Sequence, residues 1–329
     1  MATWTESQII DAIQATFPTR DDLVSRGIGD DCAVMRPHYD LVTTDASVDG
    51  VHFDLSWMTP ADAAYRCLTS NISDIAAMGG EPSAFTLALG IPKAMAFDEI
   101  TAAITALRDC IQDHDLPECW LIGGDVVRAP QLMFSVTMFG RSVHAPILRN
   151  GAHPGDAIVV LGEPGMSCIG LSLCQKGYAH SDHPNLAPFL NAFKRPRALT
   201  ALAKTIAQNG LASAMMDLSD GIRTDLPRLL AQSRCGAKID IDALSASQDM
   251  RNAAYTCGID PVSAMLCGGE DFGLLLTCPP SHLAAIKALP ASLGIPCRVI
   301  GTCTAGSIEW TEADSPSNRK DISFTHFGD

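Results

Sequence analysis

The first half of the chain alternates short apolar runs, typical of strands, with longer runs at helical spacing. The strand expected around Thr43 and Thr44 is β-branched and should end at Asp45. The helix that Pro60 opens should end at Gly79-Gly80. We predict strands at 41–44, 86–89, 120–122 and 133–139, and helices at 9–17, 60–78 and 98–112.

A turn-rich segment, Asn150 to Asp156, divides the chain into two similar halves. Because 329 residues exceed the usual size of one core, we expect two domains, 1–150 and 151–329. Glycines at 162–165 should open a helix in the second half, and its predicted strands are 157–161, 215–217, 237–241, 272–278 and 298–300. Both halves mix strands and helices, which predicts an α/β or α+β fold; the strand order stays open.

Composition and charge narrow the possible partners. The chain is 47% hydrophobic and carries a formal net charge of −14, so it has ample core material but lacks the basic surface that nucleic acid or an anionic membrane requires. Twelve cysteines form no C-x-x-C pair, and no stretch approaches the length of an apolar membrane span. We therefore expect a cytoplasmic protein with reduced thiols.

Aspartates gather beside glycines and at predicted strand ends. These are positions where carboxylates can converge on a cleft, although each one taken alone could equally be a turn former or a helix N-cap. Like charges about 4 Å apart cost roughly 4 kcal/mol per pair at an effective dielectric near 20, so a converging set needs a cation. The set comprises Asp30, Asp31, Asp45, Asp74, Asp125, Asp217 and Asp220.

Asp74 is the most unusual of these aspartates because it falls inside an apolar helix. A charge there needs a partner, and Asn71 lies three residues away on the same face. Oxygen ligands without a His or Cys cluster select hard cations, and Mg²⁺ is favoured over Ca²⁺ where phosphates take part. The chain has no Walker A motif and no dinucleotide fingerprint, which disfavours the standard nucleotide folds.

An ordered series of motifs resembles the thiamine-monophosphate kinases, a family in the superfamily of aminoimidazole-ribonucleotide synthetase. The resemblance runs nearly end to end, and the order and spacing of its motifs are specific although each motif alone is weak. The motifs are Gly27–Asp31, Thr43–Asp45 with Gly50–Phe53, Asn71–Gly79, Gly123–Asp125, Arg149 with Pro154–Asp156, Asp217–Gly221, Gly268–Asp271 and Phe324–Phe327.

The resemblance implies two α/β domains of the superfamily type and a homodimer formed by the N-terminal domains. It implies several Mg²⁺ ions, with ATP and thiamine monophosphate as substrates. Asp45, Asp74, Asp125 and Asp220 would be catalytic, Gly124, Asp125, Arg149 and Ser219 would contact ATP, and His52, Glu270 and Phe324 would contact the second substrate. The implied metal ligands are Asp30, Thr43, Thr44, Asp45, Asp74, Asp125, Asp217 and Asp220.

Phosphoryl transfer to a phosphate suits a site rich in aspartate. The nucleophilic phosphate oxygen is already ionised at neutral pH, because its second pKa is about 6, so no general base is required. Simpler interpretations remain for three of the implied residues: His52 could be an ordinary strand-end histidine, Arg149 a boundary residue, and Glu270 part of a turn. The basic segment Lys194–Arg197 is more typical of a solvated loop than of a phosphate site.

Two competing hypotheses remain at this stage. Another ATP-dependent member of the superfamily is possible, but selenophosphate synthetase would need a reactive cysteine near its N-terminus and the hydrogenase maturation protein a C-terminal cysteine. Cys32 is the first cysteine here, and the sequence ends Phe327-Gly328-Asp329. An acidic metal-binding module without catalysis would leave Arg149 and Ser219 without a role.

Overall fold

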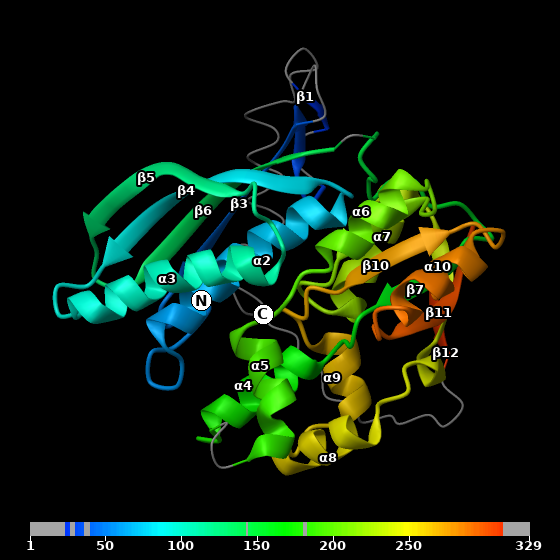
Figure 1. Ribbon diagram of the computed structural model, residues 1–329. Coiled ribbons are helices and arrows are strands. Elements are labelled where there is room, and N and C mark those ends of the chain that lie inside the picture. Colours follow the sequence, from blue (N-terminus) through cyan, green and yellow to red (C-terminus); the bar gives the residue numbers. More distant parts are fainter. Residues whose placement is uncertain (1–23, 27–29, 36–39, 143, 180–182, 312–329) are drawn as a thin grey trace, which may run out of the picture.

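Two mixed sheets, each made from one half of the chain, organise the computed structural model, which describes residues 24–26, 30–35, 40–142, 144–179 and 183–311. This arrangement confirms the expected two-part α/β class (Figure 1). The predicted helix at 9–17 lies outside the described residues. Among those described, no helix is both long enough and apolar enough to cross a membrane.

The first sheet has the strand order β1-β2-β3-β6-β4-β5. Its neighbouring strands are antiparallel, except that β5 pairs with β4 in parallel and forms one edge. The strands are β1 (Val24–Arg26), β2 (Ala33–Met35), β3 (Asp40–Val48), β4 (Glu81–Ile91), β5 (Trp120–Arg128) and β6 (Met133–Arg141). Helices α2 (Pro60–Ala77) and α3 (Phe97–Asp113) lie against one face of this sheet (Figure 1).

Two predicted strand ends are wrong. β3 continues through Asp45 to Val48, and the Gly123-Gly124-Asp125 motif lies inside β5 instead of following a strand. Gly124 explains the second error, because a Cβ atom there would lie 1.9 Å from the carbonyl oxygen of Leu87 on β4. The motif looks like a turn in the sequence, but its glycine permits close pairing of two strands.

The second sheet has the order β12-β9-β11-β7-β10-β8, and its strands β7, β8 and β10 are buried on both faces. On β7, Val159 and Leu161 belong to the apolar cluster that contains Ile206 and Ile286, whereas Ile158 and Val160 belong to the other, larger cluster. This alternation is the period of two expected for a strand between two layers. The strands are β7 (Ala157–Leu161), β8 (Ala214–Asp217), β9 (Gly236–Asp240), β10 (Leu274–Cys278), β11 (Cys297–Thr304) and β12 (Ile308–Thr311).

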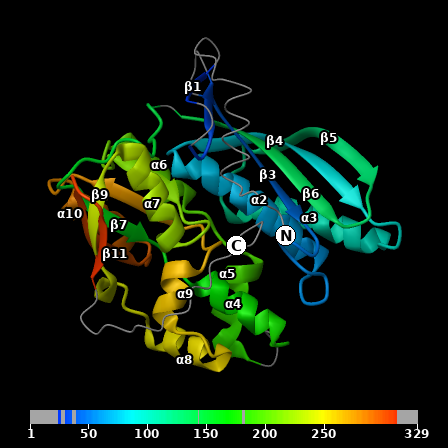
Figure 2. The same ribbon diagram turned by 180° about the vertical axis from the view of Figure 1, so that it is seen from behind.

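The helices of the second half surround its sheet and extend below α2 (Figure 2). They are α4 (Met166–Gln175), α5 (Ala187–Lys194), α6 (Thr200–Gln208), α7 (Ile222–Ser233), α8 (Gln248–Cys257), α9 (Pro261–Cys267) and α10 (Leu283–Ala291), with short 3₁₀ turns at Pro184–Leu186 and Ile241–Ala243. The first sheet ends at Arg141 and the second begins at Ala157. The predicted domain boundary after residue 150 falls between them and stays a prediction.

Helix α2 is the element that both halves share. The Thr59 hydroxyl accepts a hydrogen bond from the Asp62 N–H, Pro60 begins the first turn, and the chain leaves the helix through Gly79 at φ +73°. One side of α2 packs on β3, β4 and β6, and another contacts β8, α5 and α6. Burial on several sides explains why its sequence is largely apolar, and it leaves Asp74 at the junction of the two halves.

Candidate active site

Three carboxylates meet where the two halves join. Oxygen atoms of Asp31, Asp74 and Asp217 all lie within 4.8 Å of one another. Asp31 precedes β2, Asp74 lies on α2 and Asp217 ends β8, so both sheets contribute. Asp31 is 9% exposed and Asp217 only 2%. Three such groups so close together and so poorly hydrated form a ready set of oxygen ligands for a divalent cation.

Two hydroxyl groups orient two of these carboxylates. The Thr43 hydroxyl on β3 donates to Asp74 over 2.6 Å, and the Ser73 hydroxyl donates to Asp217 over 2.7 Å. Ser73 and Asp74 therefore engage different halves of the molecule from adjacent positions on one helix. Each hydroxyl fixes one oxygen of its carboxylate.

Arg149 is the cation that neighbours this cluster. Its guanidinium donates two hydrogen bonds to the carboxylate of Asp31, each 2.9 Å long, and its main-chain N–H donates to Asp30 over 3.3 Å. Asp30 also accepts from the Arg26 guanidinium at 3.0 Å. Asp30 therefore pairs with arginine, while Asp31 reaches both Arg149 and the other two carboxylates.

Burial and mutual repulsion raise the pKa values of two of the clustered acids, Asp74 and Asp217. The pKa of Asp74 lies well above its ordinary value because of burial, then the charges of Asp45, Asp217 and Asp31. The pKa of Asp217 is likewise raised well above normal by burial and by Asp31. Groups that resist ionisation when alone are the ones that a bound cation would stabilise most.

Asp45 and Asp220 extend the acidic region. Burial raises the pKa of Asp45, a hydrogen bond from Ser70 lowers it, and the charge of Asp220 raises it. Asp220 forms an ion pair with Arg228, and its main-chain N–H donates to the buried Asp225 carboxylate over 3.0 Å. The structure therefore places Asp220 near Asp45 across the junction.

Two predicted ligands do not join the cluster through their side chains. Thr44 lies on the opposite face of β3 from Thr43, and its exposed hydroxyl donates to the Val136 carbonyl oxygen at 2.9 Å. Asp125 is exposed on β5, three strands from β3, or about 14 Å at the usual strand spacing. In this chain, Gly124 and Asp125 lie along the sheet edge, and their roles stay predictions.

The predicted substrate residues lie near other parts of the junction. The His52 Nδ1 atom accepts from the Val48 N–H at 3.1 Å in the turn after β3. Glu270 pairs with Arg66 of α2, and its main-chain N–H donates to the Ser219 carbonyl oxygen at 2.8 Å. Phe324 lies outside the described residues, as do Gly27 to Gly29.

Two residues of the junction were missing from the predicted ligand and substrate-binding sets. Asp31 was noted within a pair of aspartates, but Asp30 was chosen as the ligand, because the sequence does not show which of two neighbours faces α2. Arg66 was not considered at all, although a single arginine in an apolar helix was a usable signal. It is only 6% exposed.

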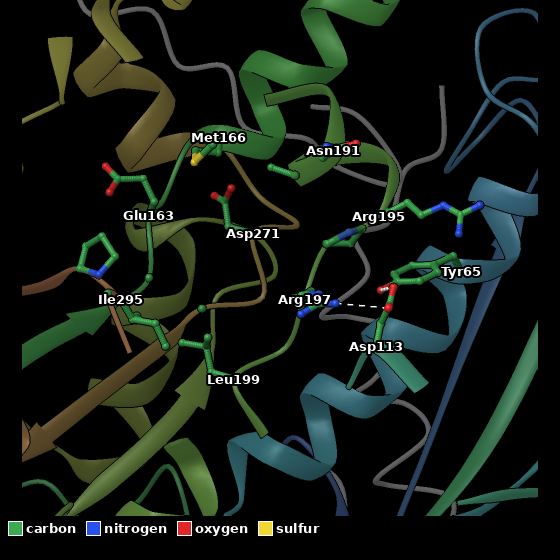
Figure 3. Close-up of a pocket in the computed structure, with 16 residues that line it drawn as sticks. Tyr65, Asp113, Glu163, Met166, Asn191, Arg195, Arg197, Leu199, Asp271 and Ile295 are labelled. Atoms are coloured by element: carbon green, nitrogen blue, oxygen red, sulfur yellow. Dashed lines mark hydrogen bonds and ion pairs between the residues drawn. The ribbon is translucent and has the colours of Figure 1, made fainter. Parts of the chain in front are cut away.

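A separate cavity of about 490 Å³ lies beside the segment that contains Asp271 (Figure 3). Glu163 and Asp271 lie on one side of it, and Tyr65, Asp113 and Arg197 lie on the other. Asp271 accepts main-chain hydrogen bonds from Gly165 and Ser167 at 2.6 and 2.8 Å, while Glu163 pairs with Arg298 at 2.6 Å. Its acids thus already have partners, and none of the clustered carboxylates lines it.

Comparison with known protein families identifies the class to which this architecture belongs. Two family models match in tandem: the N-terminal domain of AIR synthase related proteins over residues 29–142, and the C-terminal domain of the same proteins over residues 153–310. The two sheets and the junction between them thus define a protein of the AIR synthase related class.

Individual relatives identify the family within this class. The chain is 36% identical over 291 residues to thiamine-monophosphate kinase of Salmonella typhimurium, covering 86% of this chain and 85% of that protein. The Escherichia coli K12 enzyme of the same name is also 36% identical, over 294 residues with the same coverage. The solved structure of AaThiL complexed with AMPPCP and TMP is 25% identical, with a TM-score of 0.83, covering 98% of this chain and 97% of that one. This chain belongs to the thiamine-monophosphate kinases, a family of phosphotransferases.

Proposed function

We propose that the protein transfers the γ-phosphoryl group of ATP directly to the phosphate of thiamine monophosphate, forming thiamine diphosphate and ADP. The observation that carries this proposal is the convergence of Asp31, Asp74 and Asp217 from both halves of the chain. The curated relatives are thiamine-monophosphate kinases, and the structure of AaThiL holds AMPPCP and TMP together.

The donor set fits Mg²⁺. All ligand atoms of the cluster are carboxylate oxygens, and burial together with the neighbouring negative charges raises the pKa values of Asp74 and Asp217. When bound, Mg²⁺ would offset the charge of two anionic reactants and of the transferred group. We propose Asp31, Asp74 and Asp217 as the central ligands; the other proposed ligands are Asp30, Thr43, Thr44, Asp45, Asp125 and Asp220.

The protein's own side chains would position and screen the reactants. Arg149, Ser219, Gly124 and Asp125 are the proposed ATP contacts. The guanidinium of Arg149 is held by Asp31, so a positive charge is fixed at the edge of the carboxylates. The attacking phosphate oxygen is ionised at neutral pH, so these residues need only align it and exclude water.

A homodimer is part of the proposal. On β5, the exposed large apolar residues are Trp120, Leu121, Ile122, Val126 and Val127. This strand pairs with β4 on one side, and within the described residues its other edge has no strand partner. An apolar edge of this kind favours pairing with another chain, and a second copy is the simplest partner.

An assay of substrates tests the proposed function. Purified protein with Mg²⁺ should consume ATP with thiamine monophosphate and release thiamine diphosphate, but should not use thiamine. The panel should include aminoimidazole-ribonucleotide precursors and selenide, because the alternative is an aminoimidazole-ribonucleotide or selenophosphate synthetase-like reaction. Turnover of one of these, with no thiamine diphosphate formed, would replace the proposal. Turnover that survives complete chelation would contradict the role of Mg²⁺.

A further inference from the structure

Arg66 makes an unusual set of contacts deep in the junction. It is 6% exposed, although it is an arginine in the middle of α2. Its guanidinium donates to the Phe193 carbonyl oxygen over 2.5 Å, lies 4.1 Å from the centre of the Phe193 ring, and forms an ion pair with Glu270. A buried guanidinium with three kinds of partner has a fixed position, so it can hold a second residue in place.

Glu270 is the partner that needs to be held. Its φ of +62° lies in the left-handed region that side chains other than glycine rarely adopt. Its main-chain N–H donates to Ser219, a proposed ATP contact, and its side chain is 40% exposed. Strained backbone of this kind persists only where the surroundings fix it, and Arg66 supplies the side-chain part of that constraint.

Helix geometry sets Arg66 in line with the carboxylate cluster. Arg66, Ser70 and Ser73 are spaced i, i+4, i+7 and share one face of α2. Along this face Arg66 pairs with Glu270, and the Ser73 hydroxyl donates to Asp217. The helix rises about 10 Å from Arg66 to Ser73, so one small phosphorylated molecule could reach from the carboxylates to Glu270.

We propose that Arg66 is a positioning residue that determines specificity for the organic portion of the phosphate acceptor, acting through Glu270. Arg66 pairs with the Glu270 carboxylate at Oε2, and the Glu270 side chain is 40% exposed, so the carboxylate stays accessible to the acceptor. A carboxylate held in this way suits an acceptor whose organic portion is a nitrogen heterocycle with a positive charge or N–H donors, as in thiamine. This inference rests on the proposed function and extends it to a residue outside the metal and ATP sites.

The test measures steady-state kinetics together with calorimetric binding of thiamine monophosphate without ATP. Arg66→Met should raise both the KM and the Kd for thiamine monophosphate about tenfold or more, because a charge-assisted contact to Glu270 is lost. The KM for ATP should change less than about twofold, because the Arg66 side chain contacts Glu270 and Phe193, neither of which is a proposed ATP contact. Arg66→Lys, which keeps a buried cation, should recover part of the loss.

A double-mutant comparison separates positioning from a general structural role. Glu270→Gln should weaken acceptor binding as Arg66→Met does. The double variant should bind the acceptor no more weakly than Glu270→Gln alone, because both substitutions remove the same Arg66–Glu270 ion pair. Arg108→Met on α3, where Arg108 is 68% exposed, is the matched control and should behave as the unmodified protein. If Arg66→Met fails to fold, Arg66→Gln replaces it, since it keeps a donor for Phe193.

Several outcomes would overturn the inference. One is acceptor affinity in Arg66→Met or Arg66→Gln equal to that of the Arg108→Met control. A second is a loss of acceptor affinity in the double variant that equals the product of the two single losses. A third is an equal rise in the KM values for thiamine monophosphate and ATP. A protein that does not phosphorylate thiamine monophosphate at all would instead contradict the proposed function, so the two failures are distinguishable.

Discussion

Asp31 binds Arg149 through both carboxylate oxygens and still lies within reach of Asp74 and Asp217. The three acids are held by different partners: a guanidinium for Asp31, a threonine hydroxyl for Asp74 and a serine hydroxyl for Asp217. Those partners fix the carboxylates but leave negative charge uncompensated. Single substitutions should therefore separate the function of these groups from their cost to stability.

Asp217→Asn should lower kcat/KM by at least about 100-fold, which corresponds to about 2.7 kcal/mol of transition-state stabilisation. The melting temperature without metal should hold or rise, because one of three repelling groups is neutralised. Asp109→Asn on α3, where Asp109 is 40% exposed, is the control and should leave both unchanged. Near-normal kinetics in Asp217→Asn would mean that the carboxylate is structural.

The raised pKa values of Asp74 and Asp217 also predict how stability depends on pH. Their pKa values are about 3.9 in the unfolded chain and higher when folded, so the folded state binds more protons and loses stability as pH rises above about 4. Without metal, these two acids should lower the melting temperature more at pH 8 than at about pH 5. Mg²⁺ should raise the melting temperature more at pH 8, because it replaces the missing protons.

Differential scanning fluorimetry at both pH values, with and without Mg²⁺, makes this comparison. The double variant Asp74→Asn with Asp217→Asn should show a weaker pH dependence and a smaller response to Mg²⁺. An equal pH dependence in the metal-free unmodified protein and the double variant would contradict the assigned direction of the pKa shifts.

Strand β5 shows how pairing between strands overrides local sequence signals. Gly123 and Gly124 are adjacent, but only Gly124 faces a close neighbour: an added Cβ atom would lie 1.9 Å from the Leu87 carbonyl oxygen, whereas none of the surroundings of Gly123 comes within 4 Å. The two adjacent glycines therefore differ in whether they can accept a larger side chain. The pair offers a matched test of the β4–β5 contact.

Gly124→Ala should destabilise the protein by about 2 kcal/mol or more, because strand β5 must move away from β4. Gly123→Ala should stay within about 0.5 kcal/mol of the original protein, as expected for an open site. Urea unfolding of both variants measures the difference. Equal stabilities would show that β4 and β5 do not pair in this register.

The exposed edge of β5 makes a second prediction. Val126→Lys places a charge among the apolar side chains of an edge strand, so it should convert the proposed dimer into a monomer while the melting temperature of the monomer is retained. Sedimentation equilibrium measures the mass. Phe97→Lys, at a site 78% exposed on α3, is the control and should leave the dimer intact. A monomer before any substitution would contradict the dimer.

Much of this architecture could be predicted from the spacing of apolar residues and from the prolines and glycines that begin or end the elements. The helix between Pro60 and Gly79 was predicted with nearly its observed bounds, because a proline, an apolar stripe and two glycines mark it locally. The end of β3 could not be predicted, since Asp45 pairs with Val136 of β6, far away in the sequence. The pairing of Arg66 with Glu270 was missed for the same reason: long-range packing decides it.

Helix α2 joins the two halves into one working unit. Its Asp74 accepts a hydrogen bond from Thr43 of the first sheet, its Ser73 donates to Asp217 at the end of β8, and its Arg66 pairs with Glu270. Neither half alone carries Asp31, Asp74 and Asp217 together. The account therefore requires a cation held by both halves, with both reactants gathered around it.

A structure with Mn²⁺ and a non-hydrolysable ATP analogue tests this requirement most directly. Anomalous scattering should locate manganese between Asp31, Asp74 and Asp217, with carboxylate oxygens about 2.1 to 2.3 Å from the ion, near the distances usual for hard divalent cations. Nucleotide bound with no metal at these three carboxylates would contradict the account.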